Sequence, residues 1–257
     1  MKRLLLFFLP LIPICSCKKD GTNSTIDSSI HVTMREEHKG STTYLKLLLA
    51  TEKQYSCSNY QINCSGGTLG NTISLKISGY SKPSFCLTSI GPAVAELSLG
   101  HLEPKTYLIE IDFQGRMYSG KLKVDEGAYQ LSFNKSKPFL ADKPLLRRIP
   151  TSTIWGYVGY HKSGSFPKVQ GFLDSLVYLG AGPANLSAGD YNEFTIDPGG
   201  QIQTPANTGY YFYQPFVMKY PGNLSLVNQL VKNYGCNLRD SMNIGLYTHT
   251  GEFYHSW

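Results

Sequence analysis

The sequence predicts a mainly β protein, and three observations lead to this fold class. Eighteen Tyr and twelve Phe are combined with 25 Gly and 14 Pro, a composition that suits short strands separated by turns. Apolar and polar residues alternate from Tyr107 to Phe113, as expected for a strand with one buried face. After residue 16, one segment, 223–234, shows helical spacing. We therefore expect strands along most of the chain and a single helix.

The first 16 residues predict a signal peptide. Lys2 and Arg3 supply positive charge, and an apolar run extends from residue 4 to residue 14. A helix of about eleven residues spans roughly half of the hydrocarbon core of a bilayer. The run is therefore too short for a stable transmembrane helix and has the length of a signal-peptide core.

The end of this run predicts a lipid anchor. The sequence Ile14-Cys15-Ser16-Cys17 resembles the lipobox of bacterial lipoproteins, with an aliphatic residue three positions before the cysteine and a small residue next to it. The resemblance implies a diacylglyceryl thioether and an N-acyl chain on Cys17, which hold a protein stably on a membrane. An ordinary cleaved signal peptide is the alternative.

Polar and small residues after the anchor predict a flexible tether at 17–29. Its start, Lys18-Lys19-Asp20, resembles the tether of surface lipoproteins in Bacteroidota-type bacteria. The resemblance implies an exported protein attached to the cell envelope, with the outer membrane as the expected location.

Residues 30–135 predict a β-sandwich. Strands are expected at 43–50, 54–62, 72–79, 94–99, 107–113, 118–124 and 129–133. This number of short strands in about a hundred residues is typical of an immunoglobulin-like antiparallel sandwich. Both tryptophans lie outside the region, so the likeness concerns architecture alone. The segments around Tyr55–Tyr60, Cys86 and Gly91–Ala93 are similar to a module of lipoproteins in the same bacterial group.

Four cysteines remain after Cys17, namely Cys57, Cys64, Cys86 and Cys236. In an exported chain they can oxidise, and four cysteines allow three full pairings. We expect Cys57 to pair with Cys86, since both flank strand-like segments of one domain; the state of the other two is left open. The Cys57–Cys64 spacing does not fit zinc and no His lies nearby, so neither a metal nor another cofactor is expected.

Residues 136–152 predict a linker, because three prolines interrupt the strand pattern and basic residues accompany them. Residues 153–257 predict a β-rich α+β domain with one helix. In this domain we expect strands at 153–160 and 169–179, loops at 180–209, a helix at 223–234 and a hairpin formed by 243–248 and 252–257.

Charge and motifs favour a binding protein. From residue 17 onward the chain holds 22 basic and 18 acidic residues without a basic cluster, so nucleic-acid binding is not expected. His-Glu-x-x-His, Gly-x-Ser-x-Gly and Gly-x-x-x-x-Gly-Lys do not occur in the sequence. We expect a non-catalytic binding or interaction module. Its expected partners are the membrane, through the anchor, and a surface glycan or other envelope proteins.

An aromatic run in the second domain predicts a more specific binding site. If several of its rings face water, they can stack on the apolar faces of sugars. If alternate rings pack in the core, this platform does not form. The candidate residues are Tyr210, Tyr211, Tyr213 and Tyr220.

An extracellular hydrolase is the alternative from another functional class. A glycosidase would need two carboxylates on either side of the bond, and nothing in the sequence brings two together. His249 and Glu252 are expected to lie beside the Thr250–Gly251 turn, where they could orient each other as a base and its partner. The candidate acids are Asp174, Asp190, Glu193, Asp197, Asp240 and Glu252.

Overall fold

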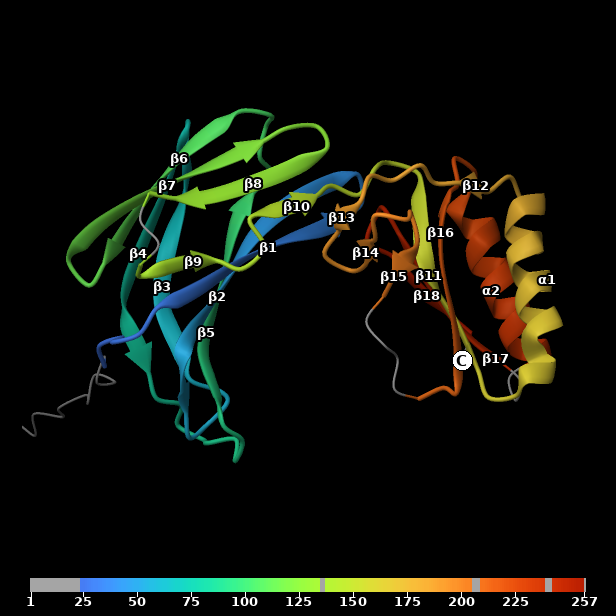
Figure 1. Ribbon diagram of the computed structural model, residues 1–257, viewed down its shortest axis with the longest axis horizontal. Coiled ribbons are helices and arrows are strands. Elements are labelled where there is room, and N and C mark those ends of the chain that lie inside the picture. The colour runs from blue at the N-terminus through green and yellow to red at the C-terminus, as the bar shows by residue number, and fades with distance from the viewer. Residues whose placement is uncertain (1–23, 135–136, 205–208, 239–241, 257) are drawn as a thin grey trace, which may run out of the picture.

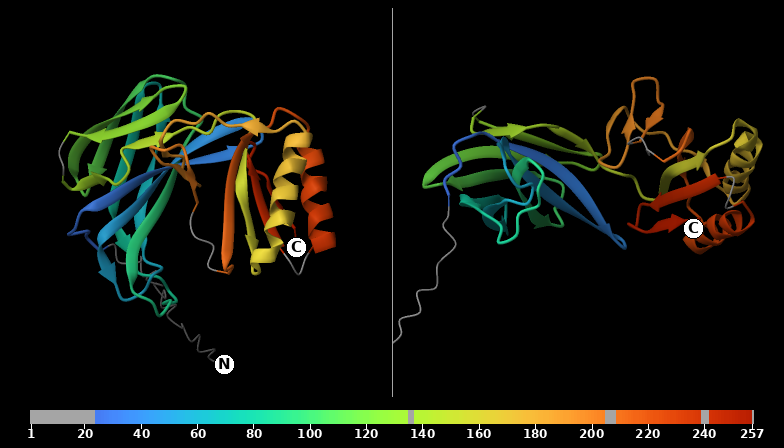
Figure 2. Two further views of the ribbon diagram at one scale, coloured as in Figure 1. Left: turned by 45° about the vertical axis from the view of Figure 1, so that its right-hand side comes forward. Right: turned by 90° about the horizontal axis from the view of Figure 1, so that it is seen from below.

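The computed structural model describes residues 24–134, 137–204, 209–238 and 242–256, and it contains two β-rich units side by side (Figure 1). The first unit is a large curled sheet. The second is a smaller sheet with two helices on one face (Figure 2). The prediction of a mainly β protein with a sandwich-like first unit is confirmed.

Ten strands form the sheet of the first unit. They are β1 (Ile30–Lys39), β2 (Thr42–Tyr55), β3 (Gln61–Leu69), β4 (Thr72–Ser81), β5 (Gly91–Gly100), β6 (Thr106–Phe113), β7 (Arg116–Val124), β8 (Ala128–Phe133), β9 (Phe139–Ala141) and β10 (Leu145–Arg147). Their order is β10-β8-β7-β6-β4-β3-β5-β2-β1-β9. Most neighbours are antiparallel, whereas β4 with β6, β3 with β5 and β1 with β9 are parallel. The strands therefore form one continuous curled sheet, whereas an immunoglobulin domain has two separate sheets.

The core of this unit follows the predicted alternation. Along β6, Tyr107, Ile109 and Ile111 are buried while Glu110 is exposed. Leu122 continues the pattern on β7, where it pairs with Tyr107. The period of two places these apolar side chains on the inner face of the curl, and their burial supplies the main stabilisation.

Two strand predictions in this unit differ from the structure. β1 was not predicted, because its inward positions include the charged Glu36 and so do not read as an apolar series. The predicted strand 54–62 is wrong: β2 ends at Tyr55 and β3 begins at Gln61. The intervening residues turn the chain between the two strands.

The segment 136–152, predicted as a linker, carries two short strands of the first sheet. β9 lies at one end of the strand order and β10 at the other. The carbonyls of the prolines next to these strands accept hydrogen bonds. The amide of Ile30 donates to the carbonyl of Pro138, and the amide of Leu131 donates to that of Pro144. Proline is tolerated at the edge of a sheet because its missing N–H removes no hydrogen bond to a neighbouring strand.

The second unit is built on a five-stranded antiparallel sheet of order β12-β16-β11-β17-β18. Its strands are β11 (Thr153–Tyr160), β12 (Gly182–Pro183), β16 (Phe212–Lys219), β17 (Met242–Thr248) and β18 (Phe253–His255). A 3-10 turn (Ser163–Ser165) precedes α1 (Phe166–Tyr178), and α2 (Leu224–Leu238) follows β16. The predicted strand 153–160, the C-terminal helix and the terminal hairpin are confirmed.

The predicted strand 169–179 is wrong, since residues 169–178 belong to α1, and the described part of the second unit contains two α-helices. Val169, Phe172 and Leu176 are spaced by three and four residues, and all three are buried against the sheet. Pro167 lies in the first helical turn, where its missing N–H has no intrahelical acceptor to lose. With α2, this helix covers one whole face of the sheet (Figure 1).

A small three-stranded sheet covers part of the opposite face. It consists of β13 (Gly189–Asp190), β14 (Thr195–Ile196) and β15 (Ile202–Gln203), within a segment predicted as loops. Phe194 and Ile196 form a separate apolar cluster with Trp155 of β11. Part of this face of the main sheet is thereby closed.

The two units meet at their hairpin turns. The amide of Gly40, between β1 and β2, donates to the carbonyl of Thr250, between β17 and β18, over 3.1 Å. Gly251 lies against the carbonyl of His38 so closely that a Cβ there would come within 2.2 Å of that oxygen. A side chain at this position would separate the two turns.

Candidate ligand-binding site

The face of the second sheet that the helices leave uncovered is lined with aromatic rings. Along β11, Trp155 and Tyr157 lie on this side, opposite Ile154 and Val158 of the helix-side core. The strand register brings one tyrosine of β16 and two rings of β17 and β18 to the same side. We call this set the aromatic face: Trp155, Tyr157, Tyr213, Tyr247 and Phe253.

The rings of the aromatic face stack on one another. The ring centroids of Trp155 and Tyr247 are 5.9 Å apart, and those of Tyr247 and Phe253 are 4.5 Å apart. Tyr157 and Tyr213 form a second stack at 5.1 Å. Such pairs contribute about 0.5–1.5 kcal/mol each beyond the burial of their surface. The stacks therefore hold the rings in place as a wall on the face opposite the helices, and Figure 1 shows this face of the sheet turned toward the first unit.

Glycines beneath the rings allow them to approach the sheet. A Cβ on Gly245 would lie 2.7 Å from the ring of Tyr157, and one on Gly159 would lie 2.4 Å from the ring of Tyr210. Glycine in a strand interior often marks such a close approach. These two positions therefore fix how deeply the rings sit.

A groove of about 460 Å³ runs between the two units beside this wall. Its size is within the range of pockets that take small ligands. Trp155, which is 3% exposed, lines it, and the indole Nε1–H has no acceptor among the described residues. We call this the interdomain groove; its lining is Arg35, Glu36, Glu37, His38, Lys46, Ile149, Trp155, Asn192, Glu193, Tyr247, Thr248 and Gly251.

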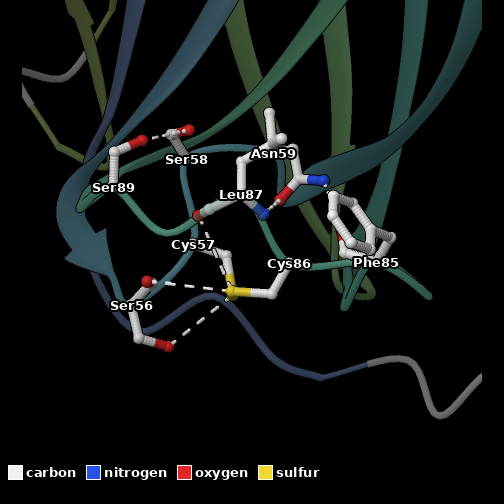
Figure 3. The surroundings of a disulfide bond; sticks show 8 residues. All are labelled: Ser56, Cys57, Ser58, Asn59, Phe85, Cys86, Leu87 and Ser89. Carbon is white, nitrogen blue, oxygen red and sulfur yellow. Dashed lines mark hydrogen bonds between the residues drawn. A yellow bond between two sulfur atoms is a disulfide. The ribbon is translucent and has the colours of Figure 1, made fainter.

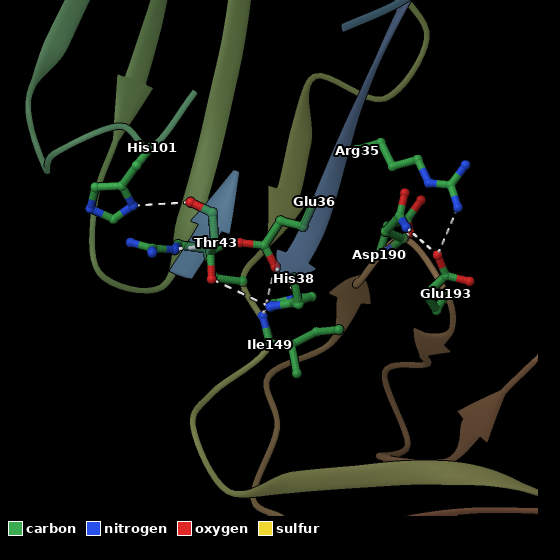
Figure 4. A network of polar contacts seen from close by, with 10 residues as sticks. Arg35, Glu36, His38, Thr43, His101, Ile149, Asp190 and Glu193 are labelled. Carbon is green, nitrogen blue, oxygen red and sulfur yellow. Dashed lines mark hydrogen bonds and ion pairs between the residues drawn. The ribbon is translucent and has the colours of Figure 1, made fainter. Parts of the chain in front are cut away.

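Hydrogen-bonding side chains from both units meet in the groove. Arg35 of β1 approaches Glu193 of the small sheet, with 3.4 Å between Nη2 and Oε1 (Figure 4). The Asn192 side chain donates to the same carboxylate over 2.7 Å, and Asn192 itself has a φ of 74°. A left-handed conformation at a non-glycine residue is uncommon and often marks a functional turn. Burial and the Glu193 charge raise the pKa of Tyr247, which keeps its hydroxyl a donor.

A buried carboxylate lies at the base of the groove. The side chain of Glu36 is 2% exposed. Its Oε2 accepts from the amide of Ile149 over 3.2 Å, and its Oε1 lies 3.5 Å from Nε of Arg148. His38 Nε2 is 3.4 Å from Oε2, at ion-pair distance without hydrogen-bond geometry (Figure 4). A charge this deeply buried is tolerated because these groups compensate it.

His249 lies near this cluster, and its imidazole has a lowered pKa. Burial lowers the pKa of its imidazole, and the proximity of His38 lowers it further. Its backbone amide donates to Thr153, but its Nδ1 has no partner among the described residues. Glu252, predicted as its partner, instead accepts from the hydroxyls of Tyr254 and Thr250. The structure therefore does not assemble the suggested base and partner.

The four predicted binding tyrosines lie in different environments. Tyr220 is buried in the helix-side core and its hydroxyl donates to the carbonyl of Asn223, so its inclusion in a solvent-facing platform is wrong. Tyr211 is exposed at the sheet edge, and Tyr210 is half-buried. Tyr213 belongs to the aromatic face and shares a hydrogen bond with Thr204. A binding role for these three exposed or half-buried rings stays a prediction.

The predicted disulfide between Cys57 and Cys86 is present, with 5.3 Å between the Cα atoms. Cys64 is a half-buried free thiol. The side chain of Cys236 and the predicted lipidation site Cys17 lie outside the described residues.

Three of the candidate acids of a hydrolase, Asp174, Asp190 and Glu193, each have a hydrogen-bond or ion-pair partner of their own. Asp190 and Glu193 share the turn between β13 and β14, but each has a cationic neighbour: Asp190 contacts Lys143 and Glu193 contacts Arg35. Asp174 on α1 accepts from Gln170. Asp240 lies outside the described residues.

Comparisons with known proteins add no relative: no protein family, curated protein or solved structure matches this chain. In the part of the chain that the structure describes, no group of three or more His, Cys, Asp or Glu side chains is placed to hold a metal ion. Within the same residues, neither helix is long and apolar enough to cross a bilayer.

Proposed function

We propose that this protein is a lipid-anchored protein of the bacterial cell envelope that binds a glycan without acting on it. Anchoring follows from the lipobox-like sequence at Cys17. Binding is assigned to the interdomain groove, where a wall of stacked rings meets hydrogen-bonding side chains of both units. That juxtaposition is the observation that carries the proposal.

The chemistry of the groove suits a sugar. A sugar ring has apolar C–H patches and a rim of hydroxyl groups, so it needs an apolar wall and planar polar partners together. The half-buried ring of Tyr247 supplies the wall, and the buried Trp155 holds it in place from behind. Arg35, Asn192 and Glu193 supply donors and acceptors in one place, already oriented by their mutual contacts. The unpaired indole N–H of Trp155 is one further donor that a bound hydroxyl can satisfy after a small shift.

Glycan-array binding tests the ligand class directly. We would apply the chain from residue 20 onward and measure the affinity for any glycan that binds. Arg35→Ala and Tyr247→Ala should each weaken binding about tenfold or more, since each removes a contact worth at least 1.4 kcal/mol. Tyr178→Ala is the matched control, because Tyr178 is an exposed tyrosine on α1, on the other side of the sheet. Equal affinities for all four proteins would contradict the assignment to the groove.

The anchor is tested independently of the ligand. Mass spectrometry of the N-terminal peptide should show acyl chains on Cys17, and Cys17→Ser should release the protein from the membrane fraction. An unmodified cysteine, or a variant that stays with membranes to the same extent, would contradict anchoring.

A further inference from the structure

The loop between β4 and β5 exposes three large apolar side chains. Phe85 is 73% exposed, Leu87 49% and Ile90 77%. Single exposed apolar residues are common on soluble proteins. Three within six residues of one loop form a patch, and such patches mark contact with another surface. We call residues 82–90 the disulfide loop, because Cys86 lies at its centre.

The disulfide loop is fixed in place. Cys86 is bonded to Cys57 of the neighbouring turn (Figure 3). The Asn59 side chain donates to the carbonyl of Phe85 over 2.7 Å and accepts from the amide of Leu87 over 3.2 Å. The apolar side chains are therefore carried by an ordered backbone. A partner surface can cover them without first ordering the loop.

The predicted flexible tether 17–29 is wrong for its described part, because Ser24 and the buried Ile26 belong to the fold, and the chain enters the fold beside this loop. Ser24 pairs with Tyr80, each residue donating its amide to the carbonyl of the other over 2.9–3.0 Å. Tyr80 lies at the end of β4, two residues before the loop begins. Gly79 makes room for this contact, since a Cβ there would lie 2.3 Å from the carbonyl oxygen of Ser24. The position of the chain at Ser24 is thus set by β4.

This entry point limits the distance from the loop to the membrane. Cys17 precedes Ser24 by seven residues, and seven residues span at most about 25 Å when fully extended. A lipid on Cys17 therefore holds the bilayer surface within about 25 Å of the end of β4. The patch carries apolar side chains together with the exposed Lys82, a combination that suits the interface of a membrane with anionic lipids.

We propose that the disulfide loop inserts Phe85, Leu87 and Ile90 into the surface of the bilayer that carries the lipid anchor. The proposal rests on the proposed lipidation of Cys17. The loop then provides a second attachment point, and two points fix the orientation of the first unit against the membrane where one flexible tether does not.

Depth-dependent quenching by brominated lipids tests this contact. The full-length lipidated protein is reconstituted into vesicles of phosphatidylethanolamine and phosphatidylglycerol with brominated acyl chains. Phe85→Trp introduces a reporter in the loop, and Leu87→Trp is a second one. Leu69→Trp is the matched control, because Leu69 is an exposed residue of the hairpin at the opposite end of β3 and β4. The unmodified protein gives the background of the two native tryptophans.

We expect strong quenching and a shift of the emission to shorter wavelengths for Phe85→Trp and Leu87→Trp, and background quenching for Leu69→Trp. Background quenching of both loop reporters would overturn the proposal, as would protection of the patch by a second copy of the chain. Mass spectrometry of the same samples separates the two proposals. Lipidated protein without loop quenching overturns the loop contact alone, whereas an unmodified Cys17 overturns the anchor on which it rests.

Discussion

Removal of the Cys57–Cys86 disulfide should lower the free energy of unfolding by about 3.6 kcal/mol. The bridge joins residues 29 positions apart. In the chain-entropy description, closing a loop of this length removes about 12 cal/mol/K from the unfolded state, which gives about 3.6 kcal/mol at 25 °C. The double variant Cys57→Ala/Cys86→Ala leaves no unpaired polar group at Cys57, which is buried.

Urea unfolding measures this loss. Far-UV circular dichroism follows both units, whereas fluorescence follows the second, since both tryptophans lie at or beyond residue 155. Cys64→Ala is the control, because Cys64 is a cysteine of the same unit outside any disulfide. Its effect should be about 1 kcal/mol or less. A loss under about 1 kcal/mol in the double variant would refute the loop-closure reasoning.

Three further predictions concern the junction between the units and the aromatic face. Glu36→Gln should cost about 3 kcal/mol in urea unfolding, because it leaves a guanidinium without its buried carboxylate, whereas the exposed Glu52→Gln should change stability by under about 0.5 kcal/mol. Since His249 has a lowered pKa when folded, only the unfolded chain takes up its proton just below pH 6.5. The contribution of His249 to the free energy of unfolding is therefore intact above about pH 6.5 and decreases as the pH falls from there to the folded pKa. His249→Gln should flatten this part of the dependence of stability on pH. Gly245→Ala should cost about 1–3 kcal/mol because the new methyl group meets a ring, while Gly182→Ala, which meets nothing within 4 Å, should be nearly neutral.

The strands that sequence reasoning located correctly are those whose pattern is local and regular. β6 alternates without interruption, and its inward residues are the predicted ones. β1 is absent from the prediction because the charged Glu36 occupies one of its buried positions. The burial of Glu36 depends on groups more than a hundred residues away in the sequence. The strand predicted at 169–179 is a helix, and Val169, Phe172 and Leu176 have helical spacing. The sequence therefore contains the helical pattern, and the predicted strand assigns the wrong periodicity to it.

The candidate site could not be predicted in the same way. Arg35 and Glu193 are 158 residues apart in sequence and meet only because the small sheet lies beside β1. The sequence shows the aromatic run but not which face of the sheet each ring lies on. Tyr213 follows the strand alternation, whereas Tyr220 lies beyond the end of β16 and is buried in the core. The aromatic face therefore combines one tyrosine of that run with rings from β11, β17 and β18.

β1 connects the end of the first unit where the N-terminal chain enters with the end that contacts the second unit. It begins at Ile30, shortly after the tether meets β4, and ends at Lys39, in the turn that contacts the second unit. A ten-residue strand is about 33 Å long. It thus acts as a spacer that sets how far the groove stands from the point of attachment. Lengthening β1 and its partner β2 by two residues each would move the groove about 7 Å further from that point and leave every side chain on its present face.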